Sequence, residues 1–255
     1  SSAASDVYKR QQCIIMNKFI LGAMAVMTTA SCWAADNKAA TPDSMGFKFT
    51  DVKLVKTTPV KDQDRSGTCW CFSGISFFED ELLRKTGKEY DLSEMFVVRH
   101  CYDDKAANFV RMYGQANFSQ GGSGLDVPYA WANYGIVPEE VYRGLNYGEK
   151  SHSHGEVCDV LTSMVKSVVR KPNKRVSTAW RKGFNGVLDA YFGELPETFT
   201  YEGKTYTPKS FAESLPINID DYVAITSFSH HPFYKPFVLE AVSYTHLRAH
   251  ETVLD

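Results

Sequence analysis

The stretch from Thr58 to Ser73, T-P-V-K-D-Q-D-R-S-G-T-C-W-C-F-S, constrains the fold of this chain more than any other. Thr-Thr-Pro indicates a turn at its start, and the glycine-containing segment that follows indicates a loop. From Cys69 onward apolar residues recur at helical spacing, until Lys85-Thr86-Gly87 supplies the basic last turn and glycine that end helices. We therefore predict a helix that begins at Cys69 and buries one face. The buried stripe is formed by Cys71, Ile75, Phe78 and Leu82.

Cys69 occupies the first position of this predicted helix, directly after the loop. The unpaired N–H groups and the helix dipole at such a position favour a thiolate over a thiol. Gln63 lies six residues upstream, where its side-chain amide could donate to a developing oxyanion. A nucleophilic cysteine with an oxyanion donor is the chemistry that this pattern predicts.

The composition favours a globular protein without nucleic-acid partners. With 255 residues, 44% of them hydrophobic, the chain can bury the core of one or two domains. Its net charge is −2, from 28 basic and 30 acidic side chains. The basic run from Arg170 to Arg175 is interrupted by Pro172 and Asn173, so we interpret it as a solvated helix end and turn.

Residues 16–35 have the form of a secretory signal peptide. Met16 and Lys18 begin a short basic start, an apolar run follows, and small residues lead to Ala35. The apolar part is too short to span a bilayer. This pattern predicts a secreted or periplasmic protein. Because Cys32 ends a segment that loosely resembles a lipobox, a lipid anchor at this cysteine stays an open alternative.

Both ends of the chain resemble translated sequencing adapters rather than protein. Residues 1–15 precede the signal peptide, and residues 243–255 follow an aromatic segment without a turn. We exclude both from fold reasoning. The expected organisation is then a linker at 36–51 and one partial domain at 52–242.

The stretch from Thr58 resembles the papain family of cysteine peptidases. This resemblance implies an α+β papain-like fold and peptide substrates, with no cofactor and no metal. It assigns the nucleophile to Cys69 and the oxyanion hole to Gln63 with the Cys69 backbone N–H. It also implies that this chain holds mainly the helical lobe and an insertion, with the β-rich lobe largely missing. The family motif T-P-V-K-x-Q-x-x-x-G-x-C-W-x-F-S is met at Thr58, Pro59, Val60, Lys61, Gln63, Gly67, Cys69, Trp70, Phe72 and Ser73.

Two later segments agree with this family. Leu92-Ser93-Glu94 resembles a helix start of the family, in which Ser93 would be the cap. Gln120-Gly121-Gly122, followed by Tyr134-Gly135-Ile136, resembles the stretch whose backbone lines the cleft and pairs with substrate. The resemblance thus implies substrate binding by Gly121, Gly122 and Trp70, since only glycine lets another backbone approach so closely. A simple glycine turn is the alternative interpretation.

Some features depart from typical secreted papains. Ser66 and Gln120 stand where those enzymes carry a disulfide, and the linker is too short for an inhibitory propeptide. These departures resemble the bacterial bleomycin hydrolase/aminopeptidase C branch, as does an apparent insertion at 223–236. That branch implies an aminopeptidase that can form a homo-oligomer, a hexamer, whereas export is indicated by the signal peptide.

A papain-like thiol needs an imidazole as its base. This histidine usually follows the cysteine by roughly 130–150 residues, yet none occurs between 155 and 229. His230 and His231 come late and precede Pro232, so we expect the base to lie beyond the chain and the chain alone to be inactive. His100 is interpreted as a core or surface histidine.

Parts of the sequence also fit other classes of function. The H-x-H-x-E-x-C run could hold a metal, but we interpret it as a solvated linker before a helix at Val160. Thiol–disulfide exchange through Cys69 and Cys71 would need a Cys-x-x-Cys motif. A non-catalytic exported binding module is the remaining alternative, and the pairing of Cys101 and Cys158 stays open. The metal-ligand candidates are His152, His154, Glu156 and Cys158.

Overall fold

The computed structural model describes residues 50–170, 175–225 and 232–236. The predicted signal peptide, Cys32, both terminal segments, His230 and His231 lie outside these residues. The chain divides into two units, residues 1–52 and 53–255. The elements below all belong to the second unit.

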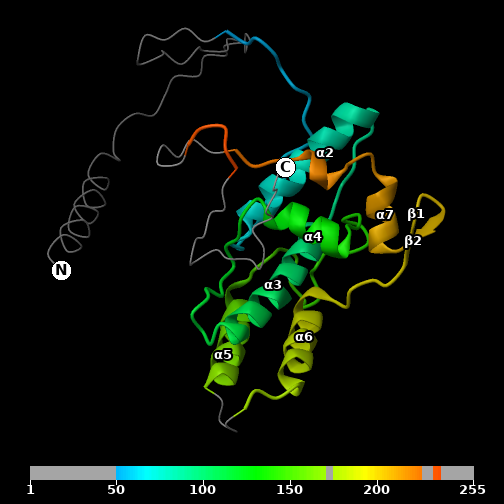
Figure 1. Cartoon of the computed structure of the whole chain (residues 1–255). Helices are drawn as coiled ribbons and strands as arrows, with labels where there is room; N and C mark the ends of the chain where they lie inside the picture. The colour runs from blue at the N-terminus through cyan, green and yellow to red at the C-terminus, as the bar shows by residue number, and fades with distance from the viewer. Residues whose placement is uncertain (1–49, 171–174, 226–231, 237–255) are drawn as a thin grey trace, which may run out of the picture. The chain divides into compact units, whose positions relative to one another are not determined.

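The described part is mainly helical, as the family resemblance implied for its helical lobe (Figure 1). The strands form one antiparallel hairpin that pairs Phe199 with Tyr206. None of the helices among residues 50–170, 175–225 and 232–236 has the length and apolar character that a membrane span requires. The helices are α2 (Cys69–Thr86), α3 (Glu94–Arg111), α4 (Asp126–Tyr134), α5 (Gly155–Val169), α6 (Ala179–Phe192), α7 (Pro208–Ser214) and the 3-10 helix η1 (Ile219–Asp221), and the strands are β1 (Phe199–Tyr201) and β2 (Lys204–Tyr206).

Helix α3 is the centre of the packing, because it contacts α2, α4, α5 and α6. Figure 1 shows α3, α5 and α6 running beside one another. Most side chains of α3 are buried, including polar ones on the face toward the candidate site such as Lys105. This central helix therefore supports the loops that precede α2 and α4.

Helix α2 confirms the predicted stripe. Cys71, Ile75 and Leu82 are fully buried, and Phe78 is nearly so. The helix ends at Gly87, whose φ of 73° lies in the left-handed region that glycine adopts at helix ends. The side chain of its N-cap residue, Thr68, accepts no hydrogen bond from the first N–H groups of α2.

The start of α3 is capped as the sequence predicts. Ser93 Oγ accepts a hydrogen bond from Phe96 N at 3.0 Å and donates to the carbonyl of Tyr142 at 2.5 Å. The hydroxyl thus satisfies one orphan donor of the helix and ties the helix to the segment after α4.

The prediction of a solvated linker before a helix at Val160 is wrong. Helix α5 begins at Gly155, and His152 and His154 before it are buried at 8% and 0% exposure. They are buried because residues 152–154 pair with the loop before α2, in a parallel bridge between Arg65 and Ser153. The Ser- and Gly-rich composition predicted solvent exposure, but this distant pairing overrides it.

Candidate active site

Cys69 stands at the N-terminus of α2, as the sequence predicts, and its side chain is exposed. The carbonyl of Thr68 accepts the backbone N–H of Cys71 at 2.8 Å and that of Phe72 at 3.2 Å, so the first turn forms directly behind the thiol. The thiol is therefore open to a substrate at a helix end that favours negative charge.

The loop before Cys69, residues 63–68, is closed on itself by reciprocal hydrogen bonds. Gln63 Nε2 donates to Ser66 O at 2.5 Å, while Ser66 Oγ donates to Gln63 O at 2.7 Å. Ser66 Oγ also lies 2.5 Å from Thr68 Oγ1. These bonds fix the half-buried amide of Gln63, which carries a second N–H donor beside the one bound to Ser66.

Residues 152–154 form hydrogen bonds to the loop at 63–68. Arg65 N donates to His152 O at 2.9 Å, and His154 N donates to Arg65 O at 3.2 Å. Asp64 Oδ2 accepts the backbone N–H of His152 at 2.9 Å. The loop that carries Gln63 is therefore paired, through its backbone, with the start of α5.

The two histidines of this segment are buried, which disfavours their charged forms. His154 Nδ1 lies 3.1 Å from the Tyr102 hydroxyl, and burial lowers the pKa of His154 to about 4. Burial also lowers the pKa of His152. His154 Nε2 and His152 Nδ1 are buried without a hydrogen-bond partner. Among the residues that the structure describes, no three His, Cys, Asp or Glu side chains gather as a metal site would require.

The predicted Gly121–Gly122 segment is held by two buried side chains. A Cβ on Gly122 would lie 2.5 Å from Trp70 Cε2 and 2.8 Å from Asp126 Oδ2, so glycine is required by this close approach. Lys105 Nζ, 5.1 Å from the centre of the Trp70 ring, donates to Gly121 O. Trp70 is only 6% exposed, so its indole supports the glycine backbone from beneath.

Gln120 joins the Gly-Gly segment to the loop before Cys69. Its Oε1 accepts the backbone N–H of Gly67 at 2.6 Å, and its carbonyl accepts Trp70 Nε1 at 3.0 Å. Its Nε2 lies 3.4 Å from His154 O. Sequence reasoning identified Gln120 only as a departure from the papain pattern and missed these contacts.

The other cysteines differ from Cys69 in environment. All four described cysteines are free thiols, and only Cys69 is exposed. Cys71 Sγ is fully buried and donates to Glu94 O at 3.3 Å, and burial raises the pKa of Cys71 and of Cys101. Thiol–disulfide exchange between Cys69 and Cys71 thus lacks an accessible second thiol.

Lys61, a residue of the sequence motif, has a structural role that the pattern did not reveal. Its Nζ lies 2.8 Å from Glu79, 3.0 Å from Glu94 and 2.6 Å from Asp91. Burial alone would lower the pKa of Lys61, but these carboxylates raise it. Burial raises the pKa of Glu94 to about 7, against the opposing effect of Lys61. This network fixes the chain before the loop to α2 and α3.

His100 packs against Tyr134, apart from Cys69 and its loop. Its ring stacks on Tyr134 with centroids 4.0 Å apart and an angle of 7°. Burial, followed by the charge of Arg99, lowers the pKa of His100 to about 3. Its prediction as a core or surface histidine fits a half-buried, stacked ring.

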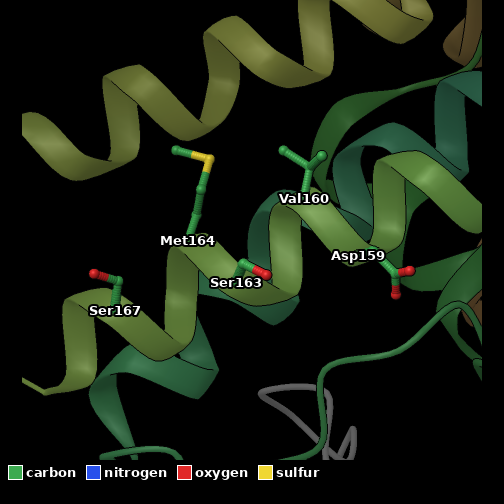
Figure 2. A pocket seen from close by; sticks show the side chains of 5 residues that line it. All are labelled: Asp159, Val160, Ser163, Met164 and Ser167. Carbon is green, nitrogen blue, oxygen red and sulfur yellow. The ribbon is translucent and has the colours of Figure 1, made fainter.

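A pocket lies along α5, apart from the residues of the candidate site (Figure 2). Its Met164 packs toward α6, where a Cβ on Gly183 would meet the Met164 methyl at 3.8 Å. None of the predicted site residues lines it. The lining residues are Asp159, Val160, Ser163, Met164 and Ser167.

Comparison with known proteins agrees with this arrangement. Residues 41–212 match the model of the family described as papain family cysteine protease. The chain is 26% identical to cathepsin K of Gallus gallus over 114 residues, and 28% identical to cathepsin K of Mus musculus over 116 residues. These alignments cover 45% and 46% of this chain and 34% of each relative. Cathepsin L2 of Homo sapiens is 34% identical over 85 residues, 33% of this chain and 23% of the relative.

The chain thus spans about a third or less of the length of these curated relatives. The family match covers more than half of the chain, and it includes the loop, Cys69 and the Gly-Gly segment. The chain belongs to the papain family of cysteine proteases.

Proposed function

We propose that this protein hydrolyses peptide bonds through a thioester acyl-enzyme on Cys69. The observation that carries the proposal is the exposed thiol at the N-terminus of α2, directly after a loop that fixes the Gln63 amide. A thiolate at this position would attack the substrate carbonyl, and the second N–H of the Gln63 amide, together with the Cys69 backbone N–H, would stabilise the oxyanion.

The proton steps need a base and an acid. An imidazole outside the described residues would take the Cys69 proton and return it to the leaving amine, after which water would release the acyl group. The described imidazoles have other contacts: His100 stacks on Tyr134, the His154 ring contacts Tyr102, and the buried His152 ring packs edge-on against His154.

Substrate would lie along the Gly121–Gly122 backbone. The Lys105 contact with Gly121 O and the Trp70 contact beneath Gly122 hold this backbone in one position. A fixed, side-chain-free backbone suits main-chain pairing with an extended peptide. In this proposal Trp70 contributes by supporting Gly122.

A labelling experiment tests the proposal. Iodoacetamide should modify Cys69 first and abolish hydrolysis of a fluorogenic peptide by the full-length protein, and Cys69→Ser should be inactive. Cys158→Ser is the matched control, because this half-buried thiol contacts Tyr102 and not the loop. Activity that survives in Cys69→Ser, or that is lost to a chelator, would sink the proposal.

We further propose an aminopeptidase of the bleomycin hydrolase/aminopeptidase C branch, exported and homo-oligomeric, with a hexamer expected. Ser66 and Gln120 support this assignment because they stand where typical secreted papains carry a disulfide. Here Ser66 Oγ donates to Gln63 O, and Gln120 Oε1 accepts the N–H of Gly67. An aminopeptidase should cleave an aminoacyl-coumarin but not its N-acetylated counterpart. Light scattering of the full-length protein would measure the oligomer, and equal cleavage of both substrates would contradict the aminopeptidase assignment.

A further inference from the structure

Gln120 is placed between the two halves of the candidate site. One half is the loop at 63–68, which carries Gln63 and leads to Cys69, and the other is the Gly121–Gly122 backbone. Gln120 directly precedes Gly121, and its side chain reaches 53 positions back to accept the N–H of Gly67 at 2.6 Å. A single residue therefore belongs to one half and bonds to the other.

The contact is close as well as hydrogen-bonded. A Cβ on Gly67 would lie 3.0 Å from Gln120 Cβ and 3.3 Å from its Oε1, which leaves little room for a side chain at position 67. The Trp70 indole bonds to the Gln120 carbonyl at 3.0 Å and so fixes the backbone of the same residue. The Gln120 amide thus has a defined position from which to hold the loop.

The other half of the site does not depend on this amide. Lys105 holds Gly121 O, and the Trp70 ring lies against Gly122. Loss of the Gln120 side chain would therefore remove the tie at Gly67 and let that end of the loop shift, while leaving the Gly-Gly backbone in place. Substrate binding and turnover should respond differently to its removal.

We propose that Gln120 is a positioning residue, which holds the loop at 63–68 through the Gly67 N–H and thereby sets the oxyanion site relative to the Gly121–Gly122 backbone. The inference rests on the proposed function. A displacement of a catalytic group by about 1 Å can lower turnover by about 100-fold, so even a modest shift of the loop would be measurable.

The test compares two substitutions in the full-length protein. Gln120→Met keeps the length of the side chain but has no acceptor, and should lower kcat by about 10- to 100-fold while KM changes by less than about threefold. Gln120→Glu keeps the acceptor and loses the weak contact with His154 O, and should restore most of kcat. Gln115→Met, at an exposed position, is the control for the substitution itself.

Hydrogen exchange supplies a readout that does not depend on turnover. The Gly67 amide should exchange faster in Gln120→Met than in the wild type or in Gln120→Glu, with no change in Gln115→Met. Unchanged exchange at Gly67, or equal kcat in the Met and wild-type enzymes, would overturn the positioning role.

The failure of the proposed function has a different signature. If Cys69→Ser kept the wild-type activity, the peptidase mechanism would be wrong and the positioning role with it, whatever the Gly67 exchange showed. If Cys69→Ser were inactive but Gln120→Met were as active as the wild type, only the role of Gln120 would fail.

Discussion

Cys69 and Cys71 stand two positions apart and differ sharply in surroundings. Cys69 is exposed, whereas the Cys71 thiol is buried against Glu94 O. We expect Cys69→Ala to abolish peptide hydrolysis and Cys71→Ala to keep it, with a stability loss of about 1 kcal/mol for the smaller core side chain. Fluorogenic assays and urea unfolding of both variants would measure this. A folded Cys71→Ala enzyme without activity would argue against the assignment of the nucleophile.

Gln63 should matter for turnover more than for binding. Its loss would remove the proposed oxyanion donor, so Gln63→Ala should lower kcat by about 10²- to 10³-fold with little change in KM. Ser66→Ala is the matched control, because it removes a hydroxyl that closes the same loop but leaves the amide in place. If the two variants lost turnover equally, Gln63 would be acting only through the shape of the loop.

The sequence alone assigns roles to these residues because the pattern that carries them is local. The loop, the cysteine and the start of α2 lie within one short stretch, whose turn, glycine and helical spacing are visible without the fold. Gln120 and His154 are different, since each gains its role from a partner far away in the chain. Gln120 accepts a hydrogen bond from Gly67, 53 positions earlier in the chain, and the sequence around Gln120 does not indicate that contact.

At the scale of single elements, the cap of α3 is the clearest case. Ser93→Ala would remove the acceptor of the Phe96 N–H and the donor to Tyr142 O, both in a buried setting. We expect a loss of about 1–2 kcal/mol in the free energy of unfolding. Chemical denaturation would measure it, with Ser151→Ala as an exposed control. A loss no larger than that of the control would show that the cap contributes nothing.

Helix α3 also contributes Lys105 to the candidate site. Lys105→Met would keep the buried aliphatic stem but lose the hydrogen bond to Gly121 O. The Gly-Gly backbone would then be less fixed, so KM for a peptide substrate should rise by about fivefold or more while kcat changes less. Lys150→Met, at an exposed position, is the control. A fall in kcat at constant KM would contradict substrate binding by this backbone.

The elements show where prediction from sequence fails. The start of α2 and the cap of α3 are predicted because apolar spacing and a single serine define them. The start of α5 is predicted five residues late, because Gly155 and the serines around it are typical of loops. Pairing with Arg65 buries this segment, and a backbone contact with a distant loop leaves no trace in composition.

At the scale of the whole molecule, two sets of buried groups with shifted pKa values change the stability in opposite directions as the pH rises. The pKa values of His154 and His100 are lowered, to about 4 and about 3, so their stabilising effect is present above pH 6.5 and is lost as the pH falls toward those values. The pKa values of Glu94 and Glu139 are raised, to about 7 and about 8, so their effect is present below pH 4.5 and is lost as the pH rises. The two effects oppose each other between about pH 4.5 and pH 6.5, so stability should decline below and above that range.

Glu139 allows a direct test of the alkaline side. Its Oε2 is buried without a hydrogen-bond partner, and burial followed by the charge of Glu94 raises its pKa. Glu139→Gln should hardly change stability at pH 4 and should stabilise the protein by about 1–3 kcal/mol at pH 9. Thermal unfolding across this range would show the gain, with Glu140→Gln, exposed, as control. A gain independent of pH would mean that charge is not its cause.

The pairing of the loop at 63–68 with the start of α5 has a consequence for folding during translation. Asp64 bonds to a residue 88 positions later, so Cys69 is synthesised long before the segment that holds its loop. Closing so long a loop is slow and follows local helix formation. A nascent chain arrested before residue 152 should thus carry a formed α2 but a loop without its partners at 152–154, and the proposed activity would be absent at that stage.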